Sequence, residues 1–263
     1  MEYVSFASGS SGNCALLRGG GVNLLIDAGI SMKRIRLSLR SLGLDLGDLR
    51  GILVTHEHSD HVAALAMLSK YTDLPVYLSR GTGEALLREG KCAGKNLRPL
   101  GEELSLDLGE LRIRGIPLMH DAAQPLGWRI EGEKSAAALL TDLGIVTEEV
   151  LAAAKGCRFA MVETNHDVEL LRRGPYPPSL QRRILGEKGH LSNEAGARLA
   201  RHLMENGAEE VLLGHLSREN NRPELALAET ARLLEGTGAE LCCAPVFGYL
   251  EREVRKAPCC ISS

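Results

Sequence analysis

A segment of seven residues, Thr55 to His61, constrains this chain more than any other part of its sequence. It reads Thr-His-Glu-His-Ser-Asp-His and directly follows the apolar run Gly51 to Val54. Imidazole and carboxylate groups are the ligands that zinc, manganese and iron accept, and crowding them together would otherwise cost desolvation without compensation. The alternative, a cluster of surface histidines, gives no chemical reason for this density. The segment therefore predicts a metal site at the end of a strand.

Length and charge set the frame for this site. The chain has 263 residues and 44% hydrophobic content, which is enough to bury a full core, and we expect one domain over residues 1–263. The net charge is -3 and the pI is near 6.3. Such a balance gives no general attraction to nucleic acid or to an anionic membrane, because proteins that bind them usually carry a basic face. A polyanionic substrate must therefore meet a local patch.

Cysteine usage predicts a reducing compartment. The seven cysteines are an odd number and none of them has C-x-x-C spacing, so neither a disulfide framework nor a zinc knuckle is indicated. The first residues lack the basic and apolar regions of a signal peptide, and no run is apolar over the length of a membrane span. We expect a cytoplasmic protein without a membrane segment. Its oligomeric state has no signal in the sequence.

Short apolar strands alternate with amphipathic helices along the whole chain. The patterns predict strands over residues 3–7, 14–18, 23–27, 51–55, 75–79, 111–119, 127–131, 135–141, 159–163, 210–216 and 240–243. Helices are predicted over residues 32–42, 61–70, 83–89, 148–154, 193–205 and 223–234. Strands come in clusters and then give way to helices, which indicates a sheet packed on a sheet with helices outside. The segment from Arg172 to Lys188, rich in Pro and Arg, is expected to form an inserted loop.

Three further polar residues follow apolar strands, where loops supported by a sheet converge on a common site. They are His120, Asp142 and His215. Each of them alone would be explained as well by a cap or by a satisfied polar group. Together with the histidines and the aspartate of the first segment, their order and spacing make a chance arrangement unreasonable.

In this order of residues the chain resembles the metallo-β-lactamase superfamily. The shared pattern is His-x-His-x-Asp-His, then a His, an Asp and a His, with an earlier Asp after a strand, here Asp27. The resemblance implies an α/β fold, a four-layer αββα sandwich with two divalent metal ions at one edge. The metals implied are zinc or manganese, with iron also suited to the ligands. In flavodiiron-type relatives, the position that corresponds to His58 looks like Glu. The histidine found here favours hydrolysis over redox chemistry.

The resemblance also assigns ligands. By carry-over, one metal is held by His56, His58 and His120, and the other by Asp60, His61 and His215. Asp142 bridges the two metals, and Asp27 orients ligands by hydrogen bonding. A pair of cations that shares a water makes hydroxide available at neutral pH. The expected nucleophile is therefore a metal-bridged hydroxide, and Asp60 belongs to the catalytic set.

Several motifs away from the ligands favour a phosphodiester substrate. His190 precedes a helical pattern whose cap is Ser192 or Asn193, and free N–H groups at a helix start attract anions. In phosphodiesterase branches similar to ribonuclease Z, a histidine in this location assists the leaving oxygen; a structural cap is the alternative. A second phosphate site is predicted in the loop containing Ser10, Ser11, Gly12 and Asn13, whose small residues permit a backbone nest, although a simple hairpin turn would explain them equally.

These motifs narrow the resemblance to the YycJ (WalJ) branch, over essentially the whole chain. That branch implies a 5′ to 3′ exonuclease acting on DNA. His166 belongs to its pattern as a site residue or as a support for one. The arginines and the lysine between Arg172 and Lys188 either contact backbone phosphates or form a solvated loop. The rival functions are an RNA or cyclic phosphodiesterase, a glyoxalase-type thioesterase or lactonase, and a metal-loaded regulatory module without catalysis.

Overall fold

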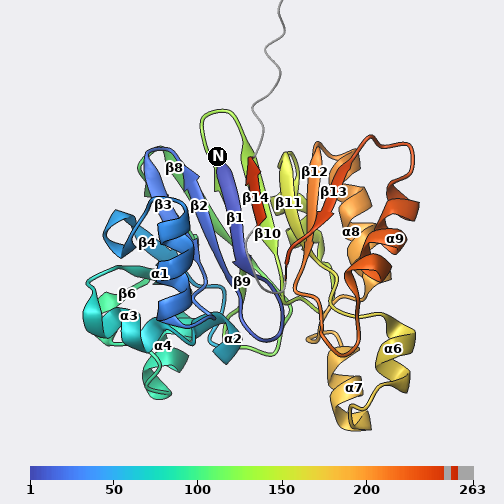
Figure 1. Cartoon of the computed structure of the whole chain (residues 1–263), viewed down its shortest axis with the longest axis horizontal. Helices are drawn as coiled ribbons and strands as arrows, with labels where there is room; N and C mark the ends of the chain where they lie inside the picture. Colours follow the sequence, from blue (N-terminus) through green and yellow to red (C-terminus); the bar gives the residue numbers. More distant parts are fainter. Residues whose placement is uncertain (246–249, 254–263) are drawn as a thin grey trace, which may run out of the picture.

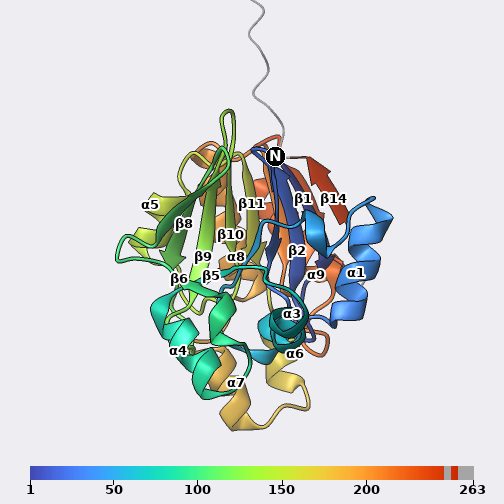
Figure 2. The ribbon, with the colours of Figure 1, turned by 90° about the vertical axis from the view of Figure 1, so that its left-hand side faces the viewer.

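Two β-sheets pack face to face and carry helices on their outer surfaces (Figures 1 and 2). The structure is a computed structural model that describes residues 1–245 and 250–253. Within these residues each sheet has seven strands. The arrangement is the four-layer αββα sandwich that the sequence predicts.

The first sheet has the strand order β14-β1-β2-β3-β4-β5-β6. Its strands are β1 (Glu2–Ala7), β2 (Cys14–Gly19), β3 (Val22–Ile26), β4 (Gly51–Leu53), β5 (Val76–Leu78), β6 (Leu97–Pro99) and β14 (Leu250–Glu253). β14, β1, β2 and β3 pair antiparallel, whereas β3, β4, β5 and β6 pair parallel. The parallel strands all end at the same edge of the sheet.

The second sheet repeats this plan in the order β13-β12-β11-β10-β9-β8-β7. Its strands are β7 (Ser105–Leu108), β8 (Leu111–Pro117), β9 (Leu126–Glu131), β10 (Ala136–Leu140), β11 (Phe159–Glu163), β12 (Glu210–Gly214) and β13 (Glu240–Cys243). β7 to β10 pair antiparallel and β10 to β13 pair parallel. Both sheets therefore offer a row of parallel strand ends from which loops reach a common site.

Helices cover the outer face of each sheet. They are α1 (Met32–Ser41), α2 (Ser59–Val62), α3 (Leu65–Tyr71), α4 (Arg80–Arg88), α5 (Glu148–Ala154), α6 (Val168–Arg173), α7 (Pro178–Ile184), α8 (Asn193–Glu205) and α9 (Pro223–Leu234), with 3₁₀ turns η1 (Leu46–Asp48) and η2 (Gly94–Asn96). α1, α3 and α4 pack on the first sheet, and α5, α8 and α9 on the second. α2, α6 and α7 lie at the lower edge in Figure 1.

The strands are apolar on both faces because each sheet lies between two layers. Leu16 of β2 packs toward the helices of the first sheet, while its neighbour Leu17 packs between the sheets. In β12, Leu213 faces the helices of the second sheet and Leu212 faces the space between the sheets, where Trp128 is fully buried. Successive side chains of a strand point to opposite faces, so a strand in this position must be apolar throughout.

The segment 172–188, expected to be a loop, is largely helical. It begins at the end of α6 and contains the whole of α7. The signal is Pro178 in the first turn of α7, where a missing N–H costs nothing, followed by Leu180 and Ile184 one turn apart. The Pro and Arg content outweighed this spacing in the sequence prediction, which was wrong here.

The helix predicted over residues 61–70 is divided into α2 and α3. Carbonyl groups of α2 are used elsewhere: Asp60 O accepts a hydrogen bond from Asn13 N at 2.7 Å, and His61 O accepts one from Ala28 N at 2.8 Å. Any side chain at position 29 would clash with this contact, because a Cβ on Gly29 would lie 1.6 Å from Asp60 O. The break in the helix therefore fixes the His-x-His-x-Asp-His segment against two neighbouring loops.

Sequence reasoning missed β6, β7 and β14, and it missed α6 as a helix. The three strands lie at or beside sheet edges. Edge strands are short and more polar because they pair on one side only. Several predicted strands also ran too far: β4, β8 and β12 end two residues before the predicted ends, at Leu53, Pro117 and Gly214. The extra residues belong to the loops of the candidate site.

The sequence analysis expected no membrane segment and no disulfide framework, and the described residues can be compared with both expectations. The helices found there are all too short or too polar to cross a membrane. Five cysteines are free thiols, and Cys259 and Cys260 lie outside the described residues. Burial raises the pKa of the Cys157 thiol to about 11, with the nearby Arg129 opposing the shift.

Candidate metal centre

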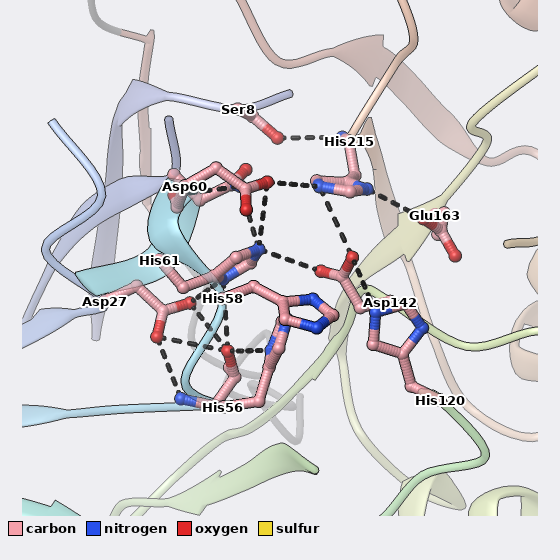
Figure 3. Close-up of polar contacts among 12 residues, drawn as sticks. Ser8, Asp27, His56, His58, Asp60, His61, His120, Asp142, Glu163 and His215 are labelled. Carbon is pink, nitrogen blue, oxygen red and sulfur yellow. Dashed lines mark hydrogen bonds and ion pairs between the residues drawn. The ribbon is translucent and has the colours of Figure 1, made fainter. Parts of the chain in front are cut away.

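Asp27 anchors the first half of the site from the end of β3. Its carboxylate accepts hydrogen bonds from the backbone N–H of Thr55 at 2.8 Å and from the Nδ1 of His61 at 2.8 Å (Figure 3). Thr55 in turn places its hydroxyl 3.0 Å from the Nδ1 of His56. Asp27 is only 3% exposed, so these contacts fix the imidazoles of the two histidines within a dry interior.

The structure brings six of the seven expected ligands together as two groups. His56, His58 and His120 form one group, and Asp60, His61 and His215 form the other. Within each group one nitrogen or oxygen atom of every residue lies within 4.8 Å of the others. These are the two trios that the resemblance assigned to separate metals. Binding of metal ions by the two trios remains a proposal. The position of Asp142 and the orientation of the imidazoles bear on it.

Asp142 lies between the two groups (Figure 3). One carboxylate oxygen is 3.1 Å from His61 Nε2, and the other is 3.5 Å from His215 Nε2 and 3.8 Å from His120 Nε2. A carboxylate in this position can offer an oxygen to each of two cations. The arrangement therefore fits the bridging role expected of Asp142.

Hydrogen bonds orient the imidazoles so that Nε2 points inward. His120 places Nδ1 at 3.0 Å from the carbonyl of Gly189, and His215 places Nδ1 at 2.8 Å from Glu163 Oε1. Since a carbonyl or carboxylate oxygen only accepts, Nδ1 must carry a proton, which leaves Nε2 free as a ligand atom. The Nε2 atoms of His56, His120 and His215 are buried and make no hydrogen bond within the described structure. Buried acceptors without partners fit coordination of a cation.

Three residues of the site have a positive φ angle, a backbone conformation that residues other than glycine seldom adopt. The φ angles are +57° at Asp27, +62° at Asp142 and +56° at His215. Each residue follows the last residue of a strand or lies two beyond it. Non-glycine residues in this region cost free energy and cluster at functional sites. The strain turns each side chain sharply out of its strand and into the shared centre.

The buried carboxylates and imidazoles of the centre shift one another's pKa values. Burial opposes ionisation, but the imidazolium groups of His215 and His61 outweigh it and hold the pKa of Asp142 well below its usual range. Burial likewise opposes the charge on His215, yet Asp142, Asp60 and Glu163 raise its pKa to about 10. For His56, burial and the neighbouring His61 lower the pKa. The carboxylates are thus anionic and attract positive charge, for which bound cations can replace protons.

His190 lies beside this centre rather than within either trio. Its Nδ1 is 2.9 Å from Glu163 Oε1 and 3.6 Å from Asp142 Oδ1. Burial lowers its pKa, but the Glu163 carboxylate outweighs that effect and raises it. Glu163 therefore orients the ring through this one nitrogen. A catalytic role for His190 stays a prediction.

The loop between β1 and β2 was expected to bind phosphate, and its residues lie in different surroundings. Asn13 is buried, with Nδ2 3.0 Å from His61 Nε2 and 3.4 Å from Asp60 Oδ2. Gly12 is also buried, whereas Ser10 and Ser11 are exposed. Asn13 therefore lies against two expected ligands. A phosphate contact from Ser10, Ser11, Gly12 and Asn13 stays a prediction.

Ser192 and Asn193 have structural contacts that account for them. Ser192 is the N-cap of α8, and its hydroxyl accepts a hydrogen bond from Ala195 N at 3.2 Å. The amide of Asn193 is buried and exchanges two hydrogen bonds with that of Asn221, at 2.9 and 2.7 Å. Their phosphate-binding role stays a prediction.

His166 is buried near the centre but outside both trios. Its backbone bridges to Ser192, and its ring nitrogens have no hydrogen-bond partner within the described residues. Burial lowers the pKa of His166 to about 4, with Glu163 opposing the shift. The ring is therefore neutral at physiological pH. A catalytic role for it stays a prediction.

Two further acidic residues, which the sequence analysis did not place in the site, have contacts beside the centre. Glu163 is fully buried, and a single oxygen of it contacts both His190 and His215. Its position at the end of β11 was the available signal, since other site residues follow strands in the same way. Glu57 is buried, and its Oε1 accepts a hydrogen bond from Ala123 N at 2.7 Å. This contact fixes the loop that carries His120.

Asp121 is a further site residue that sequence reasoning missed. Its Oδ1 lies 3.4 Å from His120 Nε2 and 3.9 Å from His58 Nε2. Its other oxygen forms an ion pair with Arg183 of α7. Arg183 belongs to the basic segment 172–188, so this ion pair joins that segment to a residue beside His120.

The fold and the centre define the class of protein. A profile described as the Beta-lactamase superfamily domain matches residues 22–216, a span that includes every expected metal ligand. The solved structure of the metallo-β-lactamase fold protein YhfI from Bacillus subtilis is similar over 95% of this chain and 99% of that one, with a TM-score of 0.72 at 16% identity. This likeness bears on the fold alone.

Similar sequences narrow the class. Exodeoxyribonuclease YycJ from Bacillus anthracis is 35% identical over 90% of both chains. Exodeoxyribonuclease WalJ from Streptococcus pneumoniae is 36% identical over 86% of this chain and 85% of that one. The chain therefore belongs to the beta-lactamase superfamily, in the branch of YycJ and WalJ.

Proposed function

We propose that this protein is a binuclear metal-dependent phosphodiesterase that acts as a DNA exonuclease. The observation that carries the proposal is the pair of ligand trios joined by Asp142, with His190 held beside them by Glu163. The names of YycJ and WalJ, relatives over most of the chain, support the choice of DNA. Zinc or manganese suits these nitrogen and oxygen ligands, and iron is compatible with them.

Two divalent ions, when bound, would supply hydroxide at neutral pH and offset negative charge on the phosphate. The protein's own residues then have separate tasks. Asp27 and Glu163 orient the imidazoles of His61 and His215. His190, with Nδ1 hydrogen-bonded to Glu163, holds a proton at Nε2 that it gives to the departing oxygen. Burial of the centre excludes bulk water around these groups and strengthens their electrostatic effects.

Because the net charge of the chain is -3, a polyanionic substrate needs a local group of positive side chains. α6 and α7 lie side by side at the lower edge of the molecule in Figure 1 and carry the exposed side chains of Arg172, Arg173, Arg182 and Arg183. Arg172 and Arg173 also pair with Glu169 on the surface of α6, where ion pairs are weak and exchange readily. We infer that these arginines contact backbone phosphates, which position a nucleic acid without reading its sequence.

The test combines metal loading with hydrolysis of end-labelled DNA. We expect the zinc- or manganese-loaded protein to shorten DNA from an end, and His58→Ala to lose both metal and hydrolysis. His190→Ala should retain the metals while its turnover falls by about 10²- to 10⁴-fold, the usual contribution of a general acid. His202→Ala, on α8 and outside the centre, is the matched control and should match the wild type.

Parallel substrates separate the rival functions. Bis-p-nitrophenyl phosphate, RNA, a cyclic nucleotide and a thioester are offered to the same metal-loaded sample. Faster turnover of the thioester than of either phosphodiester would overturn the proposal, and faster turnover of RNA would redirect it. Full metal occupancy without turnover of any ester would support a regulatory module instead.

A further inference from the structure

His58 differs from other imidazoles of the candidate centre in how its ring is held. The Nδ1 atoms of His61, His120 and His215 each lie within 3.0 Å of an oxygen that orients the ring. The ring of His58 makes no hydrogen bond to the described residues, and its Nε2 is 3.9 Å from Asp121 Oδ1, beyond hydrogen-bond distance. The place of this ring therefore depends on the backbone that carries it.

Lys91 holds the peptide group that leads into His58. Its Nζ donates a hydrogen bond to the carbonyl of Glu57 at 2.9 Å. That carbonyl and the N–H of His58 belong to one planar peptide unit, so a donor to the oxygen restrains the whole unit. Because the donor is charged, the bond is stronger than one between neutral groups. The bond from Lys91 thus restrains the direction in which the backbone places the His58 side chain.

The end of α4 fixes the position from which the Lys91 side chain starts. Gly90 has a φ angle of +65°. Its N–H donates to the carbonyl of Leu87 at 3.2 Å, and the N–H of Lys91 donates to that of Leu86 at 2.9 Å. This pair of hydrogen bonds around a left-handed glycine is a Schellman motif, which ends a helix in a defined geometry. The Lys91 ammonium is also held by Glu89, whose Oε2 lies 2.7 Å from Nζ.

The other end of α4 holds the loop that follows His120. This loop, residues 121–125, joins His120 to β9. Ser79, the N-cap of α4, donates from its hydroxyl to the carbonyl of Gln124 at 2.7 Å. Gly81 N donates to Gln124 Oε1 at 2.9 Å. A helix of the first sheet therefore supports a ligand-bearing loop of the second.

Glu57 connects the two ends of this arrangement. It lies between His56 and His58 in the sequence, and its side chain is buried. Its Oε1 accepts a hydrogen bond from Ala123 N at 2.7 Å, in the loop that α4 supports, while its carbonyl accepts from Lys91. Three of the expected ligands are therefore braced by one helix. Within the described residues, no hydrogen bond joins this helix or Lys91 to the trio that contains His61.

We infer that Lys91 is a positioning residue for one of the two metal sites. That site is the trio of His56, His58 and His120. The inference rests on the proposed function, because it takes both trios as metal sites. Ligands that are held in place before binding lose less freedom when the metal binds, so their affinity is higher. Loss of Lys91 should therefore lower the metal affinity of this trio and spare the other.

Cadmium NMR tests this role, since each bound cadmium ion gives its own resonance. The wild type should show two resonances, and Asp60→Asn, which removes a ligand of the other trio, identifies the resonance of that trio. Lys91→Met keeps most of the side chain and removes the donor. We expect the resonance of the trio with His58 to need about tenfold more free cadmium, the lower end of the usual cost of losing a ligand's partner. The other resonance should change much less.

Further variants separate positioning from a general effect on folding. Lys91→Arg supplies another charged donor at the same place and should restore much of the affinity. Lys95→Met, the same substitution at a nearby lysine that pairs with the exposed Asp73, is the matched control and should behave as the wild type. Gln124→Ala removes a contact at the other end of α4 and should weaken the same resonance as Lys91→Met. The melting temperature of each metal-free variant shows that it folds.

Two results would overturn the inference. One is unchanged cadmium affinity in both Lys91→Met and Gln124→Ala. The other is an equal loss at both sites, because a general weakening of the fold would not select one trio. If the wild type cuts DNA while these variants load both sites normally, the inference fails and the proposed function stands. If Lys91→Met weakens one resonance but the wild type cuts no DNA, the inference stands and the proposed function fails.

Discussion

At the scale of single residues, the centre depends on polar groups that touch the expected ligands. Asp27 and Glu163 are almost fully buried, and each contacts the Nδ1 of an imidazole whose Nε2 faces the centre. A carboxylate beside Nδ1 keeps the proton there and makes Nε2 the better ligand. The two acidic residues therefore set which nitrogen of His61 and of His215 is offered to a cation.

Asp27→Asn tests this role with little change of shape. Asparagine also accepts a positive φ, and its oxygen can still accept from Thr55 N. Its amide would then face His61 and donate to Nδ1, which would move the imidazole proton to Nε2. We expect metal affinity to fall by about 10- to 100-fold, the usual cost of losing such a partner, as measured by competition with a chelator.

The control for this variant is Asp107→Asn, on the exposed surface of β7. It should bind metal as the wild type does. Equal affinities in Asp27→Asn and the wild type would show that the hydrogen bond to His61 has no part in metal binding.

At the scale of elements, the side chains of the site are positioned by the ends of strands and by the start of one helix. Asp27, Asp142, Glu163 and His215 lie at or just after the ends of β3, β10, β11 and β12. His190 instead lies two residues before the Ser192 cap of α8. Only Leu191 separates His190 from this cap. The start of α8 therefore limits where the His190 ring can lie. Stability of this helix end is thus coupled to the geometry of the centre.

Ser192→Ala should weaken that helix end. The hydroxyl of Ser192 satisfies the otherwise unpaired N–H of Ala195, and loss of an N-cap costs about 1 kcal/mol of unfolding free energy. We expect the midpoint of urea denaturation to fall accordingly. Ser179→Ala, at an exposed position of α7, should change the unfolding free energy by less than about 0.5 kcal/mol. Equal effects of the two variants would contradict the role of Ser192 as a cap.

At the scale of the whole molecule, the centre joins two similar halves. Each half contributes one sheet, and their parallel strands end at the same edge of the sandwich (Figure 1). The segment with His56, His58, Asp60 and His61 follows a strand of the first sheet, whereas His120, Asp142 and His215 follow strands of the second. Cations held by both sets would tie the halves together and would stabilise only the folded state.

Metal binding should therefore raise the melting temperature. A ligand at 1,000 times its dissociation constant stabilises a protein by about 4 kcal/mol, which is roughly 10 °C for a chain of this size. Thermal scans with zinc, with manganese and with a chelator measure the shift. His202→Ala should show the full shift and His58→Ala a smaller one. An identical melting temperature with and without metal in the wild type would contradict a centre shared by the two halves.

The sequence by itself indicated a sheet packed on a sheet with helices outside and a metal site in the segment from Thr55 to His61, because apolar runs predict strands and the density of His and Asp has a chemical cause in metal binding. These are local signals, readable from neighbouring residues. The full set of candidate ligands came from the resemblance of the whole order of residues to a known family. The helical character of residues 178–184 was a local signal too, and composition obscured it.

Only the tertiary structure decided how the candidates are oriented and what surrounds them. Glu163 meets His215 across 52 positions of sequence, and Arg183 meets Asp121 across 62. Neither pairing has a periodic pattern, because side chains on separate loops become neighbours only when the two sheets pack. The bond from Lys91 to Glu57 arises in the same way, because the fold brings the end of α4 to the loop after β4.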